Sequence, residues 1–268
     1  MPNESEPGKD AFHRVPDFAR REWDTVERVL ISRHHMLQPK TKAPVVIAID
    51  GTSASGKSTN SKLVAEALNF VHVDTGAMYR TLAWYCLKQQ VDVQDAKAVA
   101  ALCRRWKTSL KCADGSAYLA VDGCYPAKEI RTAEVSAAVP HVAAIPKVRE
   151  WMKKTQRDCI KFGSLVMEGR DIGTNVFPET DFKYYLDAKL EERSRRRAAD
   201  GIHENLAARD QRDSQRAAAP LMIALGAKVI NNSQMTSAQT SGMILADIKK
   251  RLAEREKLEG KRPKAEGR

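Results

Sequence analysis

Nine residues in the first quarter of the chain have the composition and spacing of a phosphate-binding loop. Residues 51–58 match the pattern G-x-x-x-x-G-K-S, and Thr59 follows them. Its two glycines allow a tight curl in which successive backbone N–H groups point inward at an anion. Lys57 is expected to reach the β- and γ-phosphates of a nucleoside triphosphate, and Ser58 to bind a bridging Mg²⁺ ion. We predict ATP contacts along the whole run: Gly51, Thr52, Ser53, Ala54, Ser55, Gly56, Lys57, Ser58 and Thr59.

The segments on either side of this loop are those that must position it. The run 45–50, Val-Val-Ile-Ala-Ile-Asp, predicts a buried strand, and residues 61–68 predict the helix that follows the loop. That helix would add the positive end of its dipole to the anion site. The hydroxyls at 52, 53 and 55 have two open interpretations, which are hydrogen bonds that hold the turn and direct contacts to phosphate.

The pattern of strands and helices predicts an α/β fold. Apolar, strand-sized runs alternate with helical stretches, as in βαβ units, so we expect three α/β/α layers around a parallel five-stranded sheet. Between Ser109 and Glu129, two Asp-Gly turns separate three short strands and predict a small antiparallel meander. We assign it to an inserted subdomain at about 84–150. The five strands are expected at 45–50, 70–74, 164–168, 182–187 and 227–231.

Bulk properties narrow the class of protein. The chain has 268 residues and a formal charge of +11, which predicts an anionic partner. Its apolar runs are too short to cross a membrane, and its N-terminus lacks a secretory pattern, so we expect a cytoplasmic protein. The five cysteines show no C-x-x-C spacing and the histidines no H-x-x-x-H spacing. Neither set predicts a metal site.

Both ends of the chain extend beyond the predicted domain, which we place at 44–250. In the extension 1–43, Phe18, Trp23, Val26 and Leu30 fall on one side of a helix that either docks or remains a surface helix. The basic tail 251–268 raises the alternative of a nucleic-acid-binding module. It lacks aromatic residues for base stacking, so nucleic acid is not the expected partner.

Other P-loop classes fit the sequence poorly. There is no N-K-x-D run and no D-x-x-G after the loop, which argues against a switch GTPase. The chain instead resembles bacterial cytidylate kinases over roughly 45–250, and that resemblance implies the enlarged nucleotide-binding insert of the family. The most distinctive run is Glu-Gly-Arg-Asp-Ile-Gly-Thr-Asn-Val-Phe-Pro at 168–178. Further matching runs lie at 49–58, 74–80, 129–132, 142–149, 209–217 and 219–221.

The resemblance implies transfer of a phosphoryl group from MgATP to CMP or dCMP. A phosphate acceptor is already largely a dianion at neutral pH, so the reaction requires no general base. Arginines would instead bring the two polyanions together and stabilise the transferring group. By position, Arg80, Arg170 and Arg216 resemble the arginines that bind the acceptor phosphate. Arg209 resembles one near both phosphates, and Asp213 a residue that holds the ribose hydroxyls.

The choice of base has a physical interpretation. Cytosine offers an amino donor where uracil offers a carbonyl acceptor, so a carboxylate there favours cytosine. Asp171 is our candidate for that carboxylate, with Arg149 placed for the ring carbonyl and N3, and Thr75 keeping a hydroxyl found in the family. Pro140 stands where some members use a serine to contact the base. Either Ser136 substitutes or discrimination is looser, and UMP or another small phosphate stays an alternative acceptor.

An arginine-rich stretch at about 190–216 falls where a lid would close over ATP. We expect Arg193 and Arg196 to take part in catalysis, with Arg197 beside them. The alternative is a solvated helix face with i,i+4 charge pairs.

Glu168, at the end of a predicted strand, also has two interpretations. It orients a water on Mg²⁺, or it holds Arg170 or Lys57 in place. The expected small-molecule partners are ATP and CMP or dCMP, with Mg²⁺ as the metal and the enzyme acting as a monomer.

Overall fold

The structure is a computed structural model that describes residues 43–199 and 205–259. The N-terminal extension up to residue 42 and the last nine residues of the basic tail lie outside these ranges. Among the described residues, no helix combines the length and the apolar composition needed to cross a membrane.

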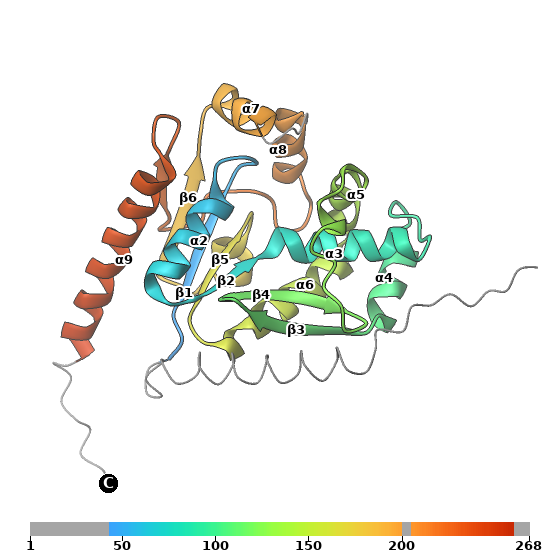
Figure 1. Ribbon diagram of the computed structural model, residues 1–268, viewed down its shortest axis with the longest axis horizontal. Helices are drawn as coiled ribbons and strands as arrows, with labels where there is room; N and C mark the ends of the chain where they lie inside the picture. Colours follow the sequence, from blue (N-terminus) through green and yellow to red (C-terminus); the bar gives the residue numbers. More distant parts are fainter. Residues whose placement is uncertain (1–42, 200–204, 260–268) are drawn as a thin grey trace, which may run out of the picture. The chain divides into compact units, whose positions relative to one another are not determined.

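A mixed sheet forms the centre of the described domain (Figure 1). Its strand order is β3-β4-β2-β5-β1-β6-β7, and neighbouring strands from β4 to β7 run parallel, whereas β3 and β4 are antiparallel. The five predicted strands are therefore present and parallel, but the sheet has seven strands rather than five. The seven are β1 (Val46–Gly51), β2 (Val71–Asp74), β3 (Thr108–Ala113), β4 (Ser116–Val121), β5 (Leu165–Gly169), β6 (Phe182–Asp187) and β7 (Lys228–Asn231).

Alternation along β1 creates the three layers. Val46 and Ala48 belong to one buried cluster, whereas Ile47 and Ile49 belong to another, because successive side chains of a strand point to opposite faces. Helices α2 and α9 cover the second cluster, and α3 to α6 cover the first (Figure 1). These helices are α2 (Lys57–Leu68), α3 (Thr75–Lys88), α4 (Ala96–Arg105), α5 (Ala133–Ala144), α6 (Pro146–Arg157) and α9 (Ser237–Glu259).

The predicted meander is a two-stranded hairpin that extends the main sheet. Strand β4 pairs in parallel with β2, with Val73 opposite Ala117, and its apolar side chains enter the main core. The second Asp-Gly turn leads only to an isolated bridge between Val121 and Cys124. Pro126 follows two residues later and has no N–H to donate, which discourages a third strand. A separate meander was therefore the wrong prediction, because β2 has an open edge that the hairpin fills.

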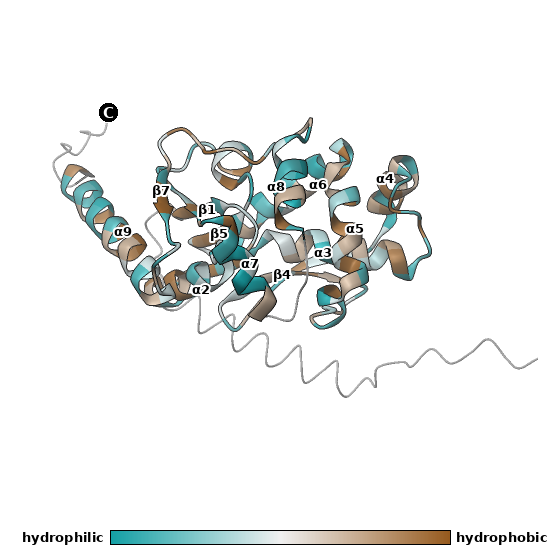
Figure 2. Cartoon of the chain, turned by 90° about the horizontal axis from the view of Figure 1, so that it is seen from above, coloured by the Kyte–Doolittle hydropathy of each residue, from teal (hydrophilic) through white to brown (hydrophobic). Residues whose placement is uncertain are grey.

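Two short helices, α7 (Leu190–Ala199) and α8 (Leu206–Ser214), occupy the predicted lid region beyond the carboxyl end of β6. Figure 2 shows that α7 is strongly hydrophilic. Helix α9 continues to Glu259, so the predicted domain boundary at 250 falls inside a helix. The remaining short elements are the 3₁₀ turns η1 (Glu129–Arg131) and η2 (Asp158–Phe162) and the π-helical turn η3 (Ile172–Val176).

Asp50 connects the end of β1 to the turn that follows β5. Its two carboxylate oxygens accept hydrogen bonds from the backbone N–H groups of Ile172 (2.9 Å) and Gly173 (2.8 Å). Burial raises the pKa of Asp50 to about 6, although these two hydrogen bonds oppose the shift. The bonds fix the backbone of η3, which directly follows Arg170 and Asp171 in the chain.

This shift predicts a specific pH dependence of stability. Because the folded-state pKa of Asp50 lies above the ordinary 3.8, the folded state binds the extra proton between about pH 4 and pH 6. The Asp50 contribution to the free energy of unfolding therefore falls by about 3 kcal/mol as the pH rises through this window. Asp50→Asn should lack this component when urea unfolding is compared at several pH values. Parallel pH curves for the wild type and Asp50→Asn would contradict the prediction, and Asp114→Asn, at an exposed turn, is the control.

Candidate functional site

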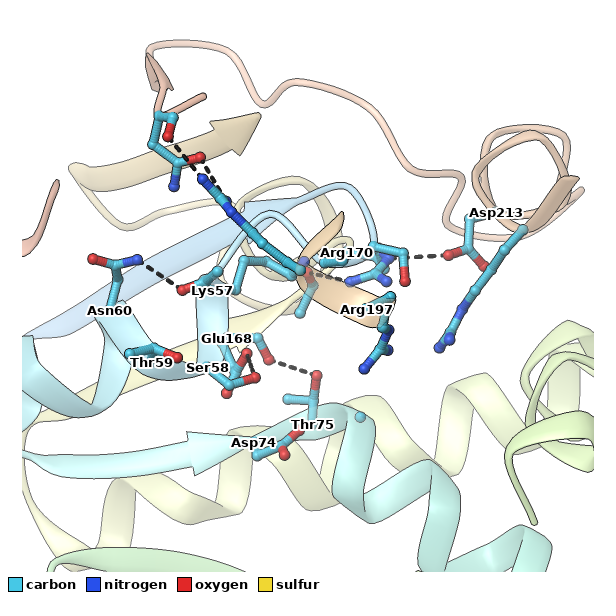
Figure 3. A pocket seen from close by; sticks show the side chains of 18 of the residues that line it. Lys57, Ser58, Thr59, Asn60, Asp74, Thr75, Glu168, Arg170, Arg197 and Asp213 are labelled. Carbon is cyan, nitrogen blue, oxygen red and sulfur yellow. Dashed lines mark hydrogen bonds and ion pairs between the residues drawn. The ribbon is translucent and has the colours of Figure 1, made fainter. Parts of the chain in front are cut away.

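A cavity of about 970 Å³ opens at the carboxyl ends of β1, β2 and β5. Its size is at the upper end of the range for small-molecule sites. Figure 3 shows residues from the phosphate-binding loop, from the start of α3 and from the segment after β5 around it. The predicted site residues that line it are Ser53, Ala54, Gly56, Lys57, Ser58, Thr59, Thr75, Arg80, Arg149, Glu168, Arg170, Asp171, Arg196, Arg209, Asp213 and Arg216.

The loop at 51–59 adopts the curled conformation that its sequence predicts. A Cβ atom on Gly51 would lie 2.0 Å from the Leu186 carbonyl oxygen, so only glycine fits there. Gly56 precedes α2 with a φ of +83°, and Ala54 adopts a left-handed φ of +58°. Non-glycine residues adopt this conformation rarely, and it concentrates at functional sites.

Two of the loop hydroxyls hold the turn. The Thr52 hydroxyl donates to Asp187 Oδ1 (3.1 Å), and the Ser55 hydroxyl donates to the Thr52 carbonyl oxygen (3.0 Å). Neither residue lines the cavity, and Gly51 does not line it either. The side-chain amide of Asn232, which directly follows β7, donates to the Ser55 carbonyl oxygen (2.8 Å) and so fixes the loop.

Lys57 is buried at the start of α2 and folds back on the loop. Its ammonium group donates to the Thr52 carbonyl oxygen and to Ser55 Oγ, the latter at 3.3 Å. Burial, and next the positive charge of Arg170, hold the pKa of Lys57 well below its ordinary value. A phosphate in the cavity would relieve this unfavourable arrangement of cations.

Glu168 and Ser58 form an oxygen-rich corner of the cavity (Figure 3). The Ser58 hydroxyl donates to Glu168 Oε2 (2.7 Å), while Glu168 Oε1 lies 3.2 Å from His72 Nε2. Mg²⁺ prefers oxygen ligands and is bound in phosphotransferases by one or two protein groups together with phosphate and water. This pair of side chains therefore fits Mg²⁺. Within the described ranges, no set of three or more His, Cys, Asp or Glu side chains forms a complete metal cluster.

Arginines line the wall opposite the loop. Arg170 Nε donates to Asp213 Oδ2 (3.0 Å), and Figure 3 shows this pair facing the cavity beyond Lys57. Burial, and next the charge of Arg209, lower the pKa of Arg80 to about 10. Arg80 Nε and Arg216 Nη2 are buried and have no hydrogen-bond partner among the described residues. Arg216 Nη2 has an ion-pair contact of 3.8 Å with Asp213 Oδ1, which is longer than a hydrogen bond. Buried donors without a hydrogen bond fit an anionic ligand.

A buried ion pair lies beside this arginine cluster. Arg149 Nη2 donates to Asp171 Oδ2 (2.6 Å), and the Arg149 guanidinium lies 5.6 Å from the centre of the Tyr79 ring. The adjacent wall, formed by α5, is apolar where Val139 and Pro140 line the cavity. Ser136 does not line it, so the structure does not place that hydroxyl as a substitute for the family's serine.

Arg193 is the predicted catalytic residue whose position differs most from expectation. It is buried, does not line the cavity, and donates to the Ser53 carbonyl oxygen (3.1 Å) and to Asp210 Oδ2. Asp210 Oδ1 in turn accepts the Ser53 backbone N–H (2.9 Å). Helices α7 and α8 thus bind both backbone groups of one loop residue. The predicted partner Arg196 does line the cavity, and it donates to the Asn232 carbonyl oxygen (2.9 Å).

Several contacts in and beside the cavity were not predicted from the sequence. His72 does not line the cavity itself, and no local pattern indicates its contact with Glu168, which does. Arg131, in η1, donates to Asp74 Oδ2 (3.1 Å), where a carboxylate and a guanidinium meet across 57 residues. The cavity is completed by the segment between β7 and α9 and by the start of α9. The connecting segment contributes Asn232, Ser233, Gln234, Met235 and Thr236, and α9 contributes Ser237 and Thr240.

A phosphate-binding loop that faces buried arginines across one cavity defines a P-loop phosphotransferase with a phosphorylated acceptor. Residues 47–250 match the cytidylate kinase family. A bifunctional pantoate ligase/cytidylate kinase from Acaryochloris marina is 42% identical over 225 residues, which cover 78% of this chain and 43% of that protein. A cytidylate kinase from Geobacillus is 38% identical over 217 residues, which cover 77% of this chain and 97% of that protein. The chain therefore belongs to the cytidylate kinase family and is a nucleoside monophosphate kinase.

Among solved structures, that of an uncharacterized protein from Eubacterium ventriosum covers 76% of this chain and 98% of that chain. It is 12% identical, with a TM-score of 0.43, and is too distant to add to this assignment.

Proposed function

We propose that the enzyme transfers the γ-phosphoryl group of ATP to CMP or dCMP, giving ADP and CDP or dCDP. The observation that carries this proposal is the Arg149–Asp171 pair, which faces the same cavity as the phosphate-binding loop and the arginine cluster. The loop would hold the donor phosphates, and the pair would bind the acceptor base. The relatives named cytidylate kinase support the same acceptor.

The proposed reaction is an in-line displacement. An oxygen of the CMP phosphate attacks the γ-phosphorus of ATP, the bond to the β–γ bridging oxygen breaks, and ADP leaves. Arg170, Arg216 and Arg80 would bind the acceptor phosphate, and Lys57, Arg209 and also Arg170 would stabilise charge on the transferring group. Arg196 would act from the lid. No base is needed, because the attacking phosphate is already deprotonated.

Ser58 and Glu168 are the residues that would hold Mg²⁺. The metal, when bound with ATP, neutralises charge on the β- and γ-phosphates. The 2.7 Å contact between these two side chains supports the view that Glu168 serves the metal site.

Base choice would rest mainly on Asp171. The α5 wall offers Val139, Pro140 and Ala143, none of which has a side-chain hydrogen bond to give. Asp171 Oδ1 would accept the cytosine amino group, Arg149 would donate to the ring, and Asp213 would hold the ribose hydroxyls. We include dCMP with CMP as an acceptor because the resemblance to the cytidylate kinase family implies both.

Asp171→Asn should weaken the preference for CMP over UMP. A carboxamide can donate to the uracil carbonyl as well as accept. The ratio of the kcat/KM values for CMP and UMP should therefore fall by a factor that corresponds to about 1–3 kcal/mol. Coupled ADP-release assays at fixed MgATP with CMP, dCMP, UMP, AMP and shikimate would measure it. An unchanged ratio would remove Asp171 from base recognition, and Asp181→Asn, at an exposed position, is the control. A wild type without preference for cytosine nucleotides would overturn the proposed acceptor.

A further inference from the structure

The Asp171 carboxylate uses its two oxygens unequally. Oδ2 accepts two hydrogen bonds, from Arg149 Nη2 (2.6 Å) and from the Asn175 side-chain amide (3.0 Å). The hydrogen bonds of the described residues leave Oδ1 without a donor, although Asp171 is 6% exposed and lines the cavity. A buried carboxylate oxygen that faces a cavity is suited to accept a hydrogen bond from a ligand.

Asn175 is itself held from behind by Lys153. The Lys153 ammonium donates to Asn175 Oδ1 (3.2 Å), and neither residue lines the cavity. An ammonium group can only donate, so it directs the amide oxygen toward Lys153 and the amide nitrogen toward Asp171.

Helix α6 and the turn η3 present these residues at matching spacings, so that Arg149 meets Asp171 and Lys153 meets Asn175. Arg149 and Lys153 lie one turn apart on α6. Asp171 directly precedes the π-helical turn η3, and Asn175 lies within it, four residues later. The Asn175 backbone N–H also donates to the Asp171 carbonyl oxygen (2.9 Å). A π-helical turn is rare and occurs mostly at functional sites.

We propose that Asn175, oriented by Lys153, is a positioning residue that keeps Asp171 Oδ1 available for the amino group of a cytosine nucleotide. A carboxylate and a guanidinium left to themselves favour a bidentate pair. Arg149 Nε is buried with no partner among the described residues, so it could take the second oxygen. Asn175 opposes that rotation by binding Oδ2. This inference rests on the proposed base-recognition role of Asp171.

The test is the CMP/UMP ratio of kcat/KM. Asn175→Leu should lower this ratio about tenfold, mainly through a higher KM for CMP, because the Asp171 carboxylate can then rotate onto Arg149. Thr174→Val is the matched control, since its buried hydroxyl has no hydrogen-bond partner among the described residues. The control should keep the wild-type ratio. Lys153→Met, at a half-buried position, should lower the ratio in the same direction by a smaller factor.

A double-mutant cycle separates positioning from general damage. If Asn175 acts through Asp171, Asn175→Leu should cause no further change of the ratio in an Asp171→Asn background. A purely structural role would lower activity on CMP and UMP alike and leave the ratio intact. A wild type that prefers CMP, with Asn175→Leu and Lys153→Met retaining that preference, would overturn the positioning role. A wild type without the preference would instead refute the proposed function. If Asn175→Leu does not fold, the Lys153→Met result decides alone.

Discussion

Arg170→Met is expected to lower kcat by about 10³-fold, with the fold retained. Arg170 is held by Asp213 at 3.0 Å and faces the cavity between the loop and the acceptor side. An arginine that stabilises charge on a transferring phosphoryl group contributes roughly 10³–10⁵ in kcat. Methionine keeps much of the apolar stem but removes the guanidinium fork, so both acceptor binding and charge stabilisation are lost.

Steady-state kinetics at saturating ATP and CMP would measure this effect. Arg212→Met is the matched control, because Arg212 is exposed on the neighbouring helix α8 and does not line the cavity. It should retain activity close to that of the wild type. A loss of less than tenfold in Arg170→Met would place Arg170 outside the transition-state contacts.

Lys57→Met is expected to lower activity strongly without lowering the stability of the nucleotide-free protein. We expect kcat to fall by about 10³-fold or more, since the loop would lose the cation that reaches the β- and γ-phosphates. The nucleotide-free variant should unfold at the same temperature as the wild type or a higher one. Burial and the neighbouring Arg170 already disfavour the charged form of Lys57, as the lowered pKa indicates.

The lowered pKa of Lys57 also predicts how the difference in stability between the wild type and Lys57→Met changes with pH. Because the pKa of Lys57 is lower in the folded state, the unfolded chain binds the extra proton, and this penalty fades as the pH rises toward the ordinary value of 10.5. Thermal unfolding of the two proteins should therefore converge at high pH. Lys62→Met, at an exposed position on α2, controls for the substitution. A variant that is markedly less stable than the wild type without nucleotide would contradict the prediction.

Both predictions depend on strand order. Strand β1 lies between β5 and β6, so the loop after β1 and the Arg170–Asp171 segment after β5 emerge side by side at one edge of the sheet. Ligands of open α/β sheets bind outside the carboxyl ends of the strands. Asp50 reinforces the arrangement by binding the backbone of η3 across 122 positions in the sequence.

The parts of the site that depend on neighbouring residues could be predicted before the structure was known. The loop at 51–59 is recognisable because one short run supplies the backbone curl, the lysine and the start of the helix that follows. Each of the five parallel strands could likewise be predicted from its own run of apolar residues. Arg170 and Asp171 were predicted differently, from the resemblance of the run at 168–178 to cytidylate kinases.

The contacts between side chains that are distant in the sequence could not be predicted and became known from the fold. It turned Arg193 from the cavity toward Ser53 and Asp210, placed His72 beside Glu168, and joined the hairpin to the free edge of β2. It also aligned α6 with η3, so that Lys153 meets Asn175. The residues in these contacts are separated by 17 to 140 positions in the sequence. Packing and the pairing of buried charges bring them together, and no local sequence pattern predicts either.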